Sequence, residues 1–298
     1  MDAADLRVFE AVARLGGMGR AAEALHTVQS NVTARIRRLE VELGTKLFRR
    51  HARGVEPTSA GCRLLPYAMR TARLLDEARR AALDDGTPAG PLVLGTLETT
   101  AALRLTPALA AFAASYPEVD LTLRTGTTCE LLELALAGAV EGAFVCGPVS
   151  HPELEAEPAF VEELALLTAP DVRSPEDVLA RVGAGAARIV VLRAGCSYRQ
   201  RLEGALVRRG IPAPRMLEFG TLEAVIGCVA AGLGVTLLPR ALVGPVWREG
   251  RVALHTLPFE EARAETVFVR RRDAHRSSAL SAFLGLACPE ARLRTAAE

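Results

Sequence analysis

The chain has 298 residues, half of them hydrophobic, and a formal net charge of +1, so it is long enough for two or three domains with sizeable cores. It contains no run of the roughly 18 apolar residues that a membrane helix needs. Its six cysteines are scattered without a CxxC motif and no secretory signal is evident, so we expect reduced thiols in a cytoplasmic protein. Residues 1–58 carry ten basic against seven acidic side chains, a mild bias that fits local binding to phosphates.

The N-terminal segment has the pattern of consecutive helices. Apolar residues recur at helical spacing over residues 5–15, and Gly16-Gly17 follows them as a stop signal. An alanine-rich helix over residues 20–25 leads to a turn in which the Thr27 hydroxyl is expected to cap the next helix. That helix, residues 28–43, carries one apolar stripe formed by Val28, Val32, Ile36, Leu39 and Leu43.

Polar groups occupy the other faces of the 28–43 helix, namely Gln29, Ser30, Thr33 and Arg37. Amides and hydroxyls of this kind can read base edges, and arginine can read guanine or hold phosphate. Residues 46–58 then combine apolar, basic and glycine residues in a pattern that suits a two-stranded wing with a basic tip. A solvated loop with scattered charge is the alternative interpretation.

Residues 59–84 are predicted to form a long amphipathic helix that Thr58 or Ser59 can cap and that residues 85–91, rich in glycine and proline, end. A long helix cannot bury its stripe on a small domain alone, so the expected partner is the same helix of another chain. Packing against its own subunit is the alternative. The stripe consists of Leu64, Leu65, Ala68, Ala72, Leu75 and Ala82.

From Leu92 onward, strand-like and helical segments alternate, which predicts parallel sheets with helices on both faces, arranged in two units. The last strand and helix are expected to return to the first unit and to leave a cleft between the two. The expected strands cover residues 92–97, 119–125, 142–147, 164–169, 188–193, 216–220, 235–239 and 265–271. The expected helices cover residues 101–115, 129–138, 175–182, 197–209, 222–231 and 277–287.

A ligand in such a fold should lie where strand C-ends and helix N-termini converge. Hydroxyls and free backbone N–H groups there favour a carboxylate or another small anion. Arg199 is a candidate counter-charge or, equally, an ordinary surface residue. Glu98 argues against a purely anionic ligand, and an ordinary helix cap is the alternative for each hydroxyl. The candidate effector-binding residues are Thr99, Thr100, Thr127, Thr128, Cys196, Ser197, Tyr198, Phe219 and Thr221.

The stretches DLRVFEAVARLGG, GRAAEALHTVQSNVTARIRRLEVELGTKLFRR and RGVEPTSAG, together with FGTLEAVIGCVAAGLGVTLLP at 219–239, resemble the LysR-type transcriptional regulators. The resemblance covers the whole chain. It implies an α/β fold class overall, with an N-terminal all-α winged helix-turn-helix, a long linker helix and a two-lobed α/β domain like the periplasmic binding proteins. The implied domains are 1–58 for DNA binding, 59–87 for the linker and dimerisation helix, and 91–298 for effector binding. Lobe I would cover about 91–147 and 266–298, and lobe II about 148–265.

The resemblance implies a DNA-binding regulator that recognises double-stranded promoter DNA and responds to a small-molecule effector. It implies a homodimer through the linker helix and often a homotetramer, with no cofactor, metal or membrane partner. The candidate DNA-binding residues are Gln29, Ser30, Asn31, Thr33, Arg35, Arg37, Arg50 and Arg53. An enzyme or a solute-binding protein is the alternative class, but no GxSxG, HExxH, P-loop or full GxGxxG motif supports catalysis.

Cys196 keeps a thiol-based alternative open. It lies at an expected helix N-terminus near Arg193 and Arg199, a setting that lowers a thiol pKa. The segment GCSYRQR also resembles the reactive-cysteine segment of the family's peroxide-sensing branch, although Ala205 and Leu206 stand where that branch carries a second cysteine. Redox sensing, a pocket thiol and an inert packed cysteine all remain possible interpretations.

Overall fold

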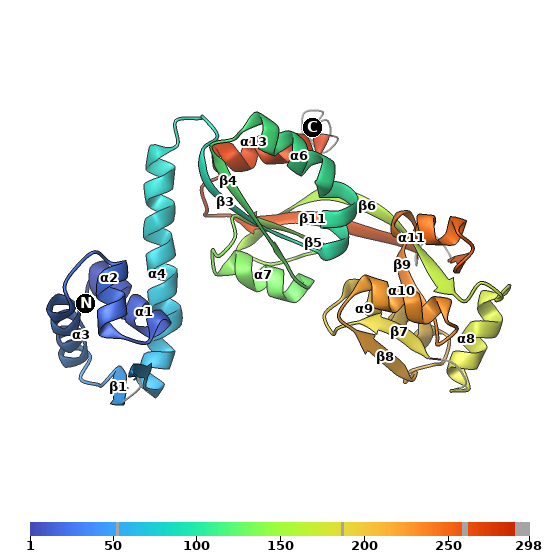
Figure 1. The fold of residues 1–298 in the computed structure, drawn as a ribbon, viewed down its shortest axis with the longest axis horizontal. Coiled ribbons are helices and arrows are strands. Elements are labelled where there is room, and N and C mark those ends of the chain that lie inside the picture. Colours follow the sequence, from blue (N-terminus) through green and yellow to red (C-terminus); the bar gives the residue numbers. More distant parts are fainter. Residues whose placement is uncertain (52–53, 186–187, 258–261, 290–298) are drawn as a thin grey trace. The chain divides into compact units, whose positions relative to one another are not determined.

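The structure is a computed structural model that describes residues 1–51, 54–185, 188–257 and 262–289. Its contacts divide the chain into two compact units, Met1–Asp85 (unit 1) and Gly86–Glu298 (unit 2). Figure 1 shows the order of the elements along the chain. Unit 1 contains α1 (Ala3–Leu15), α2 (Met18–Ala24), α3 (Gln29–Glu42), β1 (Phe48–His51), β2 (Gly54–Pro57) and α4 (Ser59–Leu83).

Helix α1 starts earlier than its apolar pattern indicates because Asp2 caps it. The Asp2 and Asp5 side chains accept each other's backbone N–H in a capping box, and Gly16, at a φ of 67°, ends the helix in the left-handed region. The inner face of α1 carries Phe9 and Val12, which are fully buried in a core shared with α2 and α3. The three helices therefore form one small domain around a common core.

Helix α3 differs in two respects from the expected pattern. Val32, Ile36 and Leu39 are buried, but Val28 is 64% exposed and Leu43 is also exposed, so the apolar stripe is shorter at both ends. Val28, rather than Thr27, occupies the N-cap position and gives no side-chain cap. Thr27 lies one residue upstream, where its backbone N–H closes the turn onto the carbonyl of Ala22.

The predicted wing is present as an antiparallel pair, β1 with β2. Helix α4 follows it directly, and its cap agrees with expectation, because the Thr58 hydroxyl accepts the backbone N–H of Gly61. Ala68 of α4 is buried against the unit 1 core. Beyond it the helix leaves large apolar side chains exposed, namely Leu74, Leu75 and Leu83.

Unit 2 alternates strands and helices. Its first part contains β3 (Gly90–Thr96), α5 (Glu98–Thr100), the π-helical turn η1 (Ala101–Leu105), α6 (Thr106–Ser115), β4 (Val119–Thr125), α7 (Thr128–Leu136) and β5 (Gly142–Cys146). Its second part contains β6 (Leu154–Thr168), α8 (Pro175–Gly183), β7 (Ile189–Leu192), α9 (Ser197–Arg208), β8 (Met216–Phe219), α10 (Leu222–Ala230), β9 (Thr236–Pro239), α11 (Arg240–Arg248) and β10 (Ala253–Thr256). The chain then continues through β11 (Arg263–Arg271) and α13 (Ser278–Ala287).

The main sheet of unit 2 is mixed rather than parallel, which corrects the sequence prediction. Its strand order is β10-β6-β11-β5-β3-β4, with β9 also paired to β6. Strand β3 pairs in parallel with β4 and β5, as βαβ connections require. Strand β6 pairs antiparallel with β9, β10 and β11, and β11 pairs antiparallel with β5.

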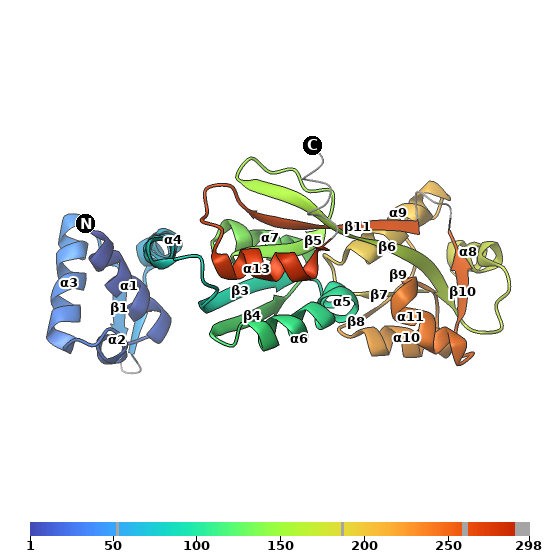
Figure 2. The same cartoon turned by 90° about the horizontal axis from the view of Figure 1, so that it is seen from above.

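Two lobes share this sheet. Lobe I is formed by β3, β4, β5, α5, α6, α7 and α13, and lobe II by β7, β8, β9, β10, α8, α9, α10 and α11. Strands β6 and β11 run side by side from one lobe into the other (Figure 2). Residues 154–163 of β6, expected within lobe II, pair with β11 instead. Helices α6 and α13 cover one face of the lobe I strands and α7 covers the other (Figure 1).

Three elements of the structure were not predicted from the sequence, namely the first half of β6, helix α11 and strand β10. The first half of β6 contains several glutamates, which are atypical of a strand. Helix α11 contains Gly244 and Pro245, which are atypical of a helix. Strand β10 has only four residues. The expected helix over residues 101–115 is present, but a π-helical turn joins its two α-helical parts.

Replacement of Gly142 by alanine should destabilise unit 2. A Cβ atom at this position would lie 2.1 Å from Cζ of Phe268, whose ring is buried and packs at 4.9 Å from the ring of Phe144. We expect Gly142→Ala to lower the free energy of unfolding by about 2 kcal/mol, measured by urea denaturation. Gly227→Ala is the control, because its Cβ meets nothing within 4 Å in helix α10 and the substitution should stabilise the helix slightly.

Candidate functional site

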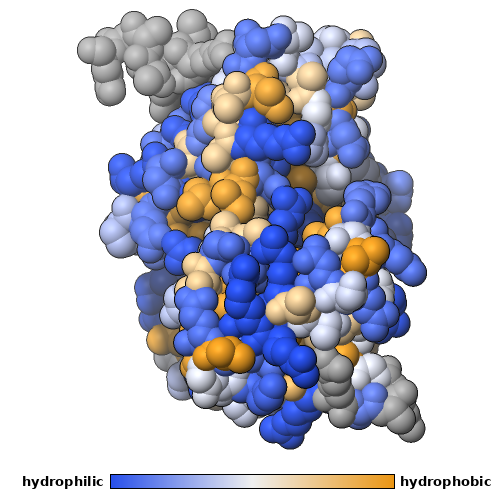
Figure 3. Space-filling view, turned by 90° about the vertical axis from the view of Figure 1, so that its left-hand side faces the viewer, coloured by the Kyte–Doolittle hydropathy of each residue, from blue (hydrophilic) through white to orange (hydrophobic). Residues whose placement is uncertain are grey.

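The outward face of α3 forms an open, shallow surface in unit 1. Figure 3 views the side of the molecule on which α3 lies and shows mostly hydrophilic residues there, with small separate apolar areas. Gln29, Ser30 and Arg37 are exposed on this surface, and Thr33 is half-buried. The residues that line the surface are Gln29, Ser30, Thr33, Ala34, Arg37, Arg38 and Val41.

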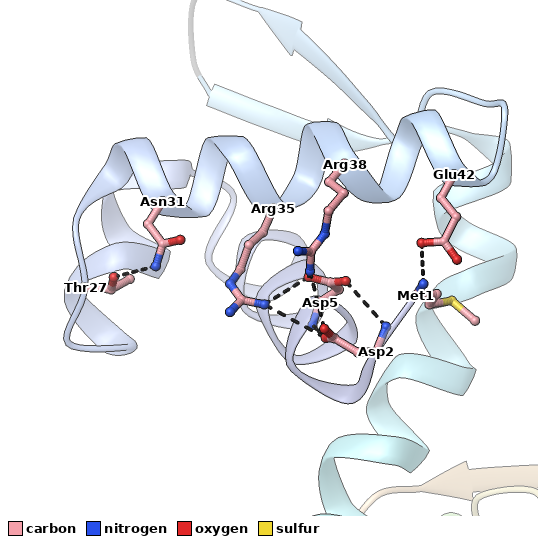
Figure 4. A network of polar contacts seen from close by, with 8 residues as sticks. All are labelled: Met1, Asp2, Asp5, Thr27, Asn31, Arg35, Arg38 and Glu42. Carbon is pink, nitrogen blue, oxygen red and sulfur yellow. Dashed lines mark hydrogen bonds and ion pairs between the residues drawn. The ribbon is translucent and has the colours of Figure 1, made fainter.

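An ion-pair network fixes α3 on α1 (Figure 4). The Asp5 carboxylate, 1% exposed, accepts hydrogen bonds from Arg35 at 3.0 Å and from Arg38 at 2.5 Å. Asp2 adds a longer contact to each arginine. Burial raises the pKa of Asp5, but the hydrogen bonds from Arg38, from the backbone of Asp2 and from Arg35 outweigh it, so the pKa lies below its ordinary value.

A second set of contacts joins α3 to the wing. The Glu40 carboxylate accepts the backbone N–H groups of Leu47 and Phe48 and pairs with Lys46 at 2.8 Å. The other end of the wing rests on the turn between α1 and α2, where the backbone N–H of Val55 donates to the carbonyl of Gly16 at 3.1 Å. The approach is close enough that a Cβ atom at Gly54 would lie 2.6 Å from that carbonyl oxygen.

The predicted DNA-contacting residues are not equivalent in the structure. Gln29, Ser30, Thr33 and Arg37 share the α3 surface. Arg35 does not belong with them, because its guanidinium turns inward to Asp5. Asn31 is exposed, but its side-chain amide donates to the hydroxyl of Thr27 (Figure 4). Arg50 belongs to β1 by its backbone, and Arg53 lies outside the described residues.

A small cavity lies between the two lobes of unit 2, at the C-ends of parallel strands. Its volume is about 70 Å³. Lobe I contributes the residues that follow β3 and β4, and lobe II contributes those that follow β7 and β8. The lining residues are Leu97, Glu98, Thr99, Thr125, Gly126, Thr127, Leu192, Arg193, Cys196, Ser197, Tyr198 and Gly220.

The two lobes touch beside this cavity. The hydroxyls of Thr99 in lobe I and Tyr198 in lobe II are 3.0 Å apart and both side chains are buried. Burial raises the pKa of Tyr198 to about 12, so its phenol stays protonated. A Cβ atom at Gly195 would lie 3.1 Å from Cβ of Thr127, so the loop before α9 also contacts lobe I closely.

The helix N-termini at the cavity are not equally open. Glu130 accepts both the backbone N–H and the hydroxyl of Thr127, so α7 is capped by its own side chain. The Thr127 backbone and hydroxyl donors hold the pKa of Glu130 below its ordinary value, with a smaller contribution from the charge of Arg193. An anion at this point would compete with a carboxylate that is already in place.

Two sequence expectations about lobe II are wrong. Burial raises the pKa of the Cys196 thiol and outweighs the backbone N–H groups of Arg199 and Tyr198, so the helix N-terminus does not activate this cysteine. Arg199 is no free counter-charge, because it pairs with Glu203 at 2.9 Å and with Glu218 at 2.5 Å. Arg193 lines the cavity instead.

Five of the predicted effector residues line the cavity, and four do not. Thr99, Thr127, Cys196, Ser197 and Tyr198 are on its wall. The Thr128 hydroxyl accepts the backbone N–H of Cys146, and Thr100 is buried away from the cavity wall. Thr221 caps α10, and Phe219 packs against the lobe II core. Glu98 and Arg193 also line the cavity, and both lie just after a parallel strand, β3 and β7. Their position at the C-end of a strand could have predicted them from the sequence.

Within the described ranges, no helix is long and apolar enough to cross a membrane. The same ranges contain no group of three or more acidic, histidine or cysteine side chains placed to hold a metal ion. The arrangement is thus a helix-turn-helix with a wing, followed by a two-lobed unit with a small cavity between its lobes. It defines a DNA-reading module joined to a ligand-binding module.

Comparisons with known proteins identify the family. Residues 3–62 match the family described as "Bacterial regulatory helix-turn-helix protein, lysR family", and residues 85–290 match "LysR substrate binding domain". The chain belongs to the LysR family and is a DNA-binding transcriptional regulator with an effector-binding domain, not an enzyme.

Two relatives from Bacillus subtilis match nearly the whole chain. The uncharacterized HTH-type transcriptional regulator YusT is 45% identical over 284 residues, 95% of this chain and 94% of its own. The HTH-type transcriptional regulator GltR is 42% identical over 282 residues, 94% of this chain and 93% of its own.

Solved structures share the fold. Full-length CbnR in complex with its target DNA is 26% identical, with a TM-score of 0.62 over 96% of this chain and 99% of that one. A full-length OxyR variant from Pseudomonas aeruginosa is 22% identical, with a TM-score of 0.71 over 98% of this chain and 97% of that one. The latter likeness concerns the fold alone.

Removal of the buried charge in unit 1 should loosen α3. We expect Asp5→Asn to lower the free energy of unfolding by about 2 kcal/mol at pH 7, because two arginines lose a shared carboxylate. Chemical denaturation monitored by circular dichroism measures the change. Asp76→Asn is the control, since its contact with Arg7 at 3.9 Å is exposed.

The same network has a defined pH dependence. The pKa of Asp5 is depressed in the folded state, so its stabilisation is complete above the ordinary value of 3.8 and is lost as the pH falls through the lower folded value. The stability difference between wild type and Asp5→Asn should therefore be constant from pH 5 to pH 8 and shrink below about pH 4. A difference that persists unchanged at pH 2 would contradict this assignment.

Loss of the Tyr198 hydroxyl should destabilise the contact between the lobes. Tyr198→Phe leaves the buried Thr99 hydroxyl without its partner, and we expect a cost of about 1–2 kcal/mol in urea denaturation. Tyr67→Phe, on the exposed surface of α4, serves as the control and should change stability by less than about 0.5 kcal/mol. Equal effects of the two substitutions would show that the interlobe hydrogen bond does not stabilise the fold.

Proposed function

We propose that this regulator reads its promoter through the α3 surface and that a small molecule bearing a carboxylate or another anionic group binds between the lobes and alters DNA binding. The observation that carries the first part is the face of α3 itself. It exposes an amide, a hydroxyl and a guanidinium, at Gln29, Ser30 and Arg37, along one helix. These groups match the donors and acceptors of the major groove.

The way α3 is held supports the same assignment. Arg35 and Arg38 join α3 to Asp5, and Glu40 joins it to the start of the wing. A recognition helix has to keep its angle to the rest of the domain, because each base contact depends on a fixed geometry. The complex of CbnR with its target DNA supports promoter DNA as the partner. Arg50 and Arg53 of the wing are proposed to hold phosphate or enter the minor groove.

The proposed domain boundaries are those expected from the sequence, with residues 1–58 reading DNA, 59–87 linking and 91–298 binding the effector. Helix α4 is proposed to pair with its counterpart in a second chain. Its exposed Leu74, Leu75 and Leu83 lie beyond the part that packs on the unit 1 core. Two such dimers would form the homotetramer. A regulator of chromosomal DNA acts in the cytoplasm, which is the proposed location.

The effector proposal rests on the cavity between the lobes. Hydroxyls from both lobes and the guanidinium of Arg193 line it, and a cationic side chain favours an anionic ligand group. A ligand held by both lobes changes the free energy of their contact, and only a ligand with different affinities for two arrangements can shift the equilibrium between them. DNA binding would respond through that shift.

Substitution of Gln29 should change which sequences are bound. We expect Gln29→Ala to weaken binding to the preferred duplex, selected from a random library, by roughly tenfold to hundredfold and to leave binding to unrelated duplexes unchanged. Fluorescence anisotropy with both duplexes measures the ratio. The matched control is Gln200→Ala, an exposed amide of α9 in unit 2. An unchanged preference would remove Gln29 from the reading surface.

A further inference from the structure

The interlobe cavity contains charges of both signs. Glu98 stands at the start of α5 in lobe I, and Arg193 follows β7 in lobe II. Among the described residues, neither the Glu98 carboxylate nor the Arg193 guanidinium forms an ion pair or a side-chain hydrogen bond. Both side chains are exposed, and the charge of Arg193 also acts on the nearby Glu130. The structure therefore places a solvated anion and a solvated cation on the wall of one cavity.

A third polar group on the cavity wall is the hydroxyl of Ser197. Ser197 is 8% exposed, lines the cavity and forms no side-chain hydrogen bond with the part of the chain that the structure describes. Two neighbouring hydroxyls are already engaged, because Thr99 bonds to Tyr198 and Thr127 bonds to Glu130. The Ser197 hydroxyl can therefore donate a hydrogen bond to a ligand atom in the cavity.

The size of the cavity limits what can fill it. A water-sized group needs roughly 10–15 Å³ of such volume. The cavity of about 70 Å³ thus has room for only a few such groups, close in number to the non-hydrogen atoms of a small metabolite.

We propose that the ligand of this cavity is a small zwitterion, an α-amino acid with a short side chain, whose carboxylate meets Ser197 and Arg193 and whose ammonium meets Glu98. This rests on the proposed effector function and specifies its ligand class. A purely anionic ligand would leave the Glu98 carboxylate unpaired and would repel it. A zwitterion satisfies both charges and joins the lobes, because its ammonium binds lobe I and its carboxylate binds lobe II.

The test compares three probes of similar size on the full-length protein by isothermal titration calorimetry. L-Alanine carries both charges, propionate carries only the carboxylate, and ethylamine carries only the ammonium. We expect L-alanine to bind at least tenfold more tightly than either single-charge probe. Propionate binding as tightly as L-alanine would overturn the proposal in favour of a simple anion.

Variants assign the charges. Glu98→Gln should weaken L-alanine binding about tenfold and tighten propionate binding, because it removes the repulsion of the carboxylate, whereas Ser197→Ala should weaken both. Glu118→Gln is the matched control, an exposed carboxylate before β4 that is not part of the cavity, and it should change neither. Equal weakening of propionate by Glu98→Gln would contradict the assigned contact.

DNA binding separates failure of this proposal from failure of the proposed function. Fluorescence anisotropy with the selected duplex is measured alongside the titrations. If none of the probes binds while the duplex is still bound with its sequence preference, the amino acid class is wrong and the DNA-reading function stands. Loss of all duplex preference in the wild-type protein would instead count against the proposed reading surface.

Discussion

The geometry of the reading surface depends on one buried carboxylate. Asp5 is almost inaccessible to water, yet it stays ionised because two guanidinium groups of α3 share it. A charge buried in this way is costly unless its partners are held in place, so the pair fixes the angle between α1 and α3 as strictly as the apolar core does. Both Arg35 and Arg37 were predicted to contact DNA. In the structure Arg37 faces outward, whereas Arg35 faces inward to Asp5.

In the second unit, the C-terminal ends of two parallel strand pairs, one in each lobe, meet at the cavity. Loops after β3, β4, β7 and β8 bring polar groups of both lobes to one cavity. Some of these groups are already engaged, as Thr99 is with Tyr198 and Thr127 is with the cap residue Glu130. The proposed ligand class follows from the charges of Glu98 and Arg193 and from the hydroxyl of Ser197 on the same wall.

Periodicity sufficed to predict the elements in which one face is buried. The helices α1, α3 and α4 and the strands β3, β4 and β5 follow directly from their apolar spacing, and family motifs set their order. Contacts between distant segments could not be predicted in this way. Nothing local shows that Arg35 meets Asp5, that Arg199 meets Glu218, or that burial outweighs a helix N-terminus at Cys196. The glutamates in the first half of β6 favour a loop by sequence, whereas in the structure Glu155 pairs with Arg270 of the adjacent strand β11.

The paired strands β6 and β11 have a mechanical consequence. Nine residues of β11 pair with β6, so the lobes cannot slide past one another without breaking the ladder. They can bend about it, and the register shift between Thr266 and Val267 is the point where this ribbon is least regular. The ladder therefore favours bending of the two lobes about β6 and β11 over sliding of one lobe past the other.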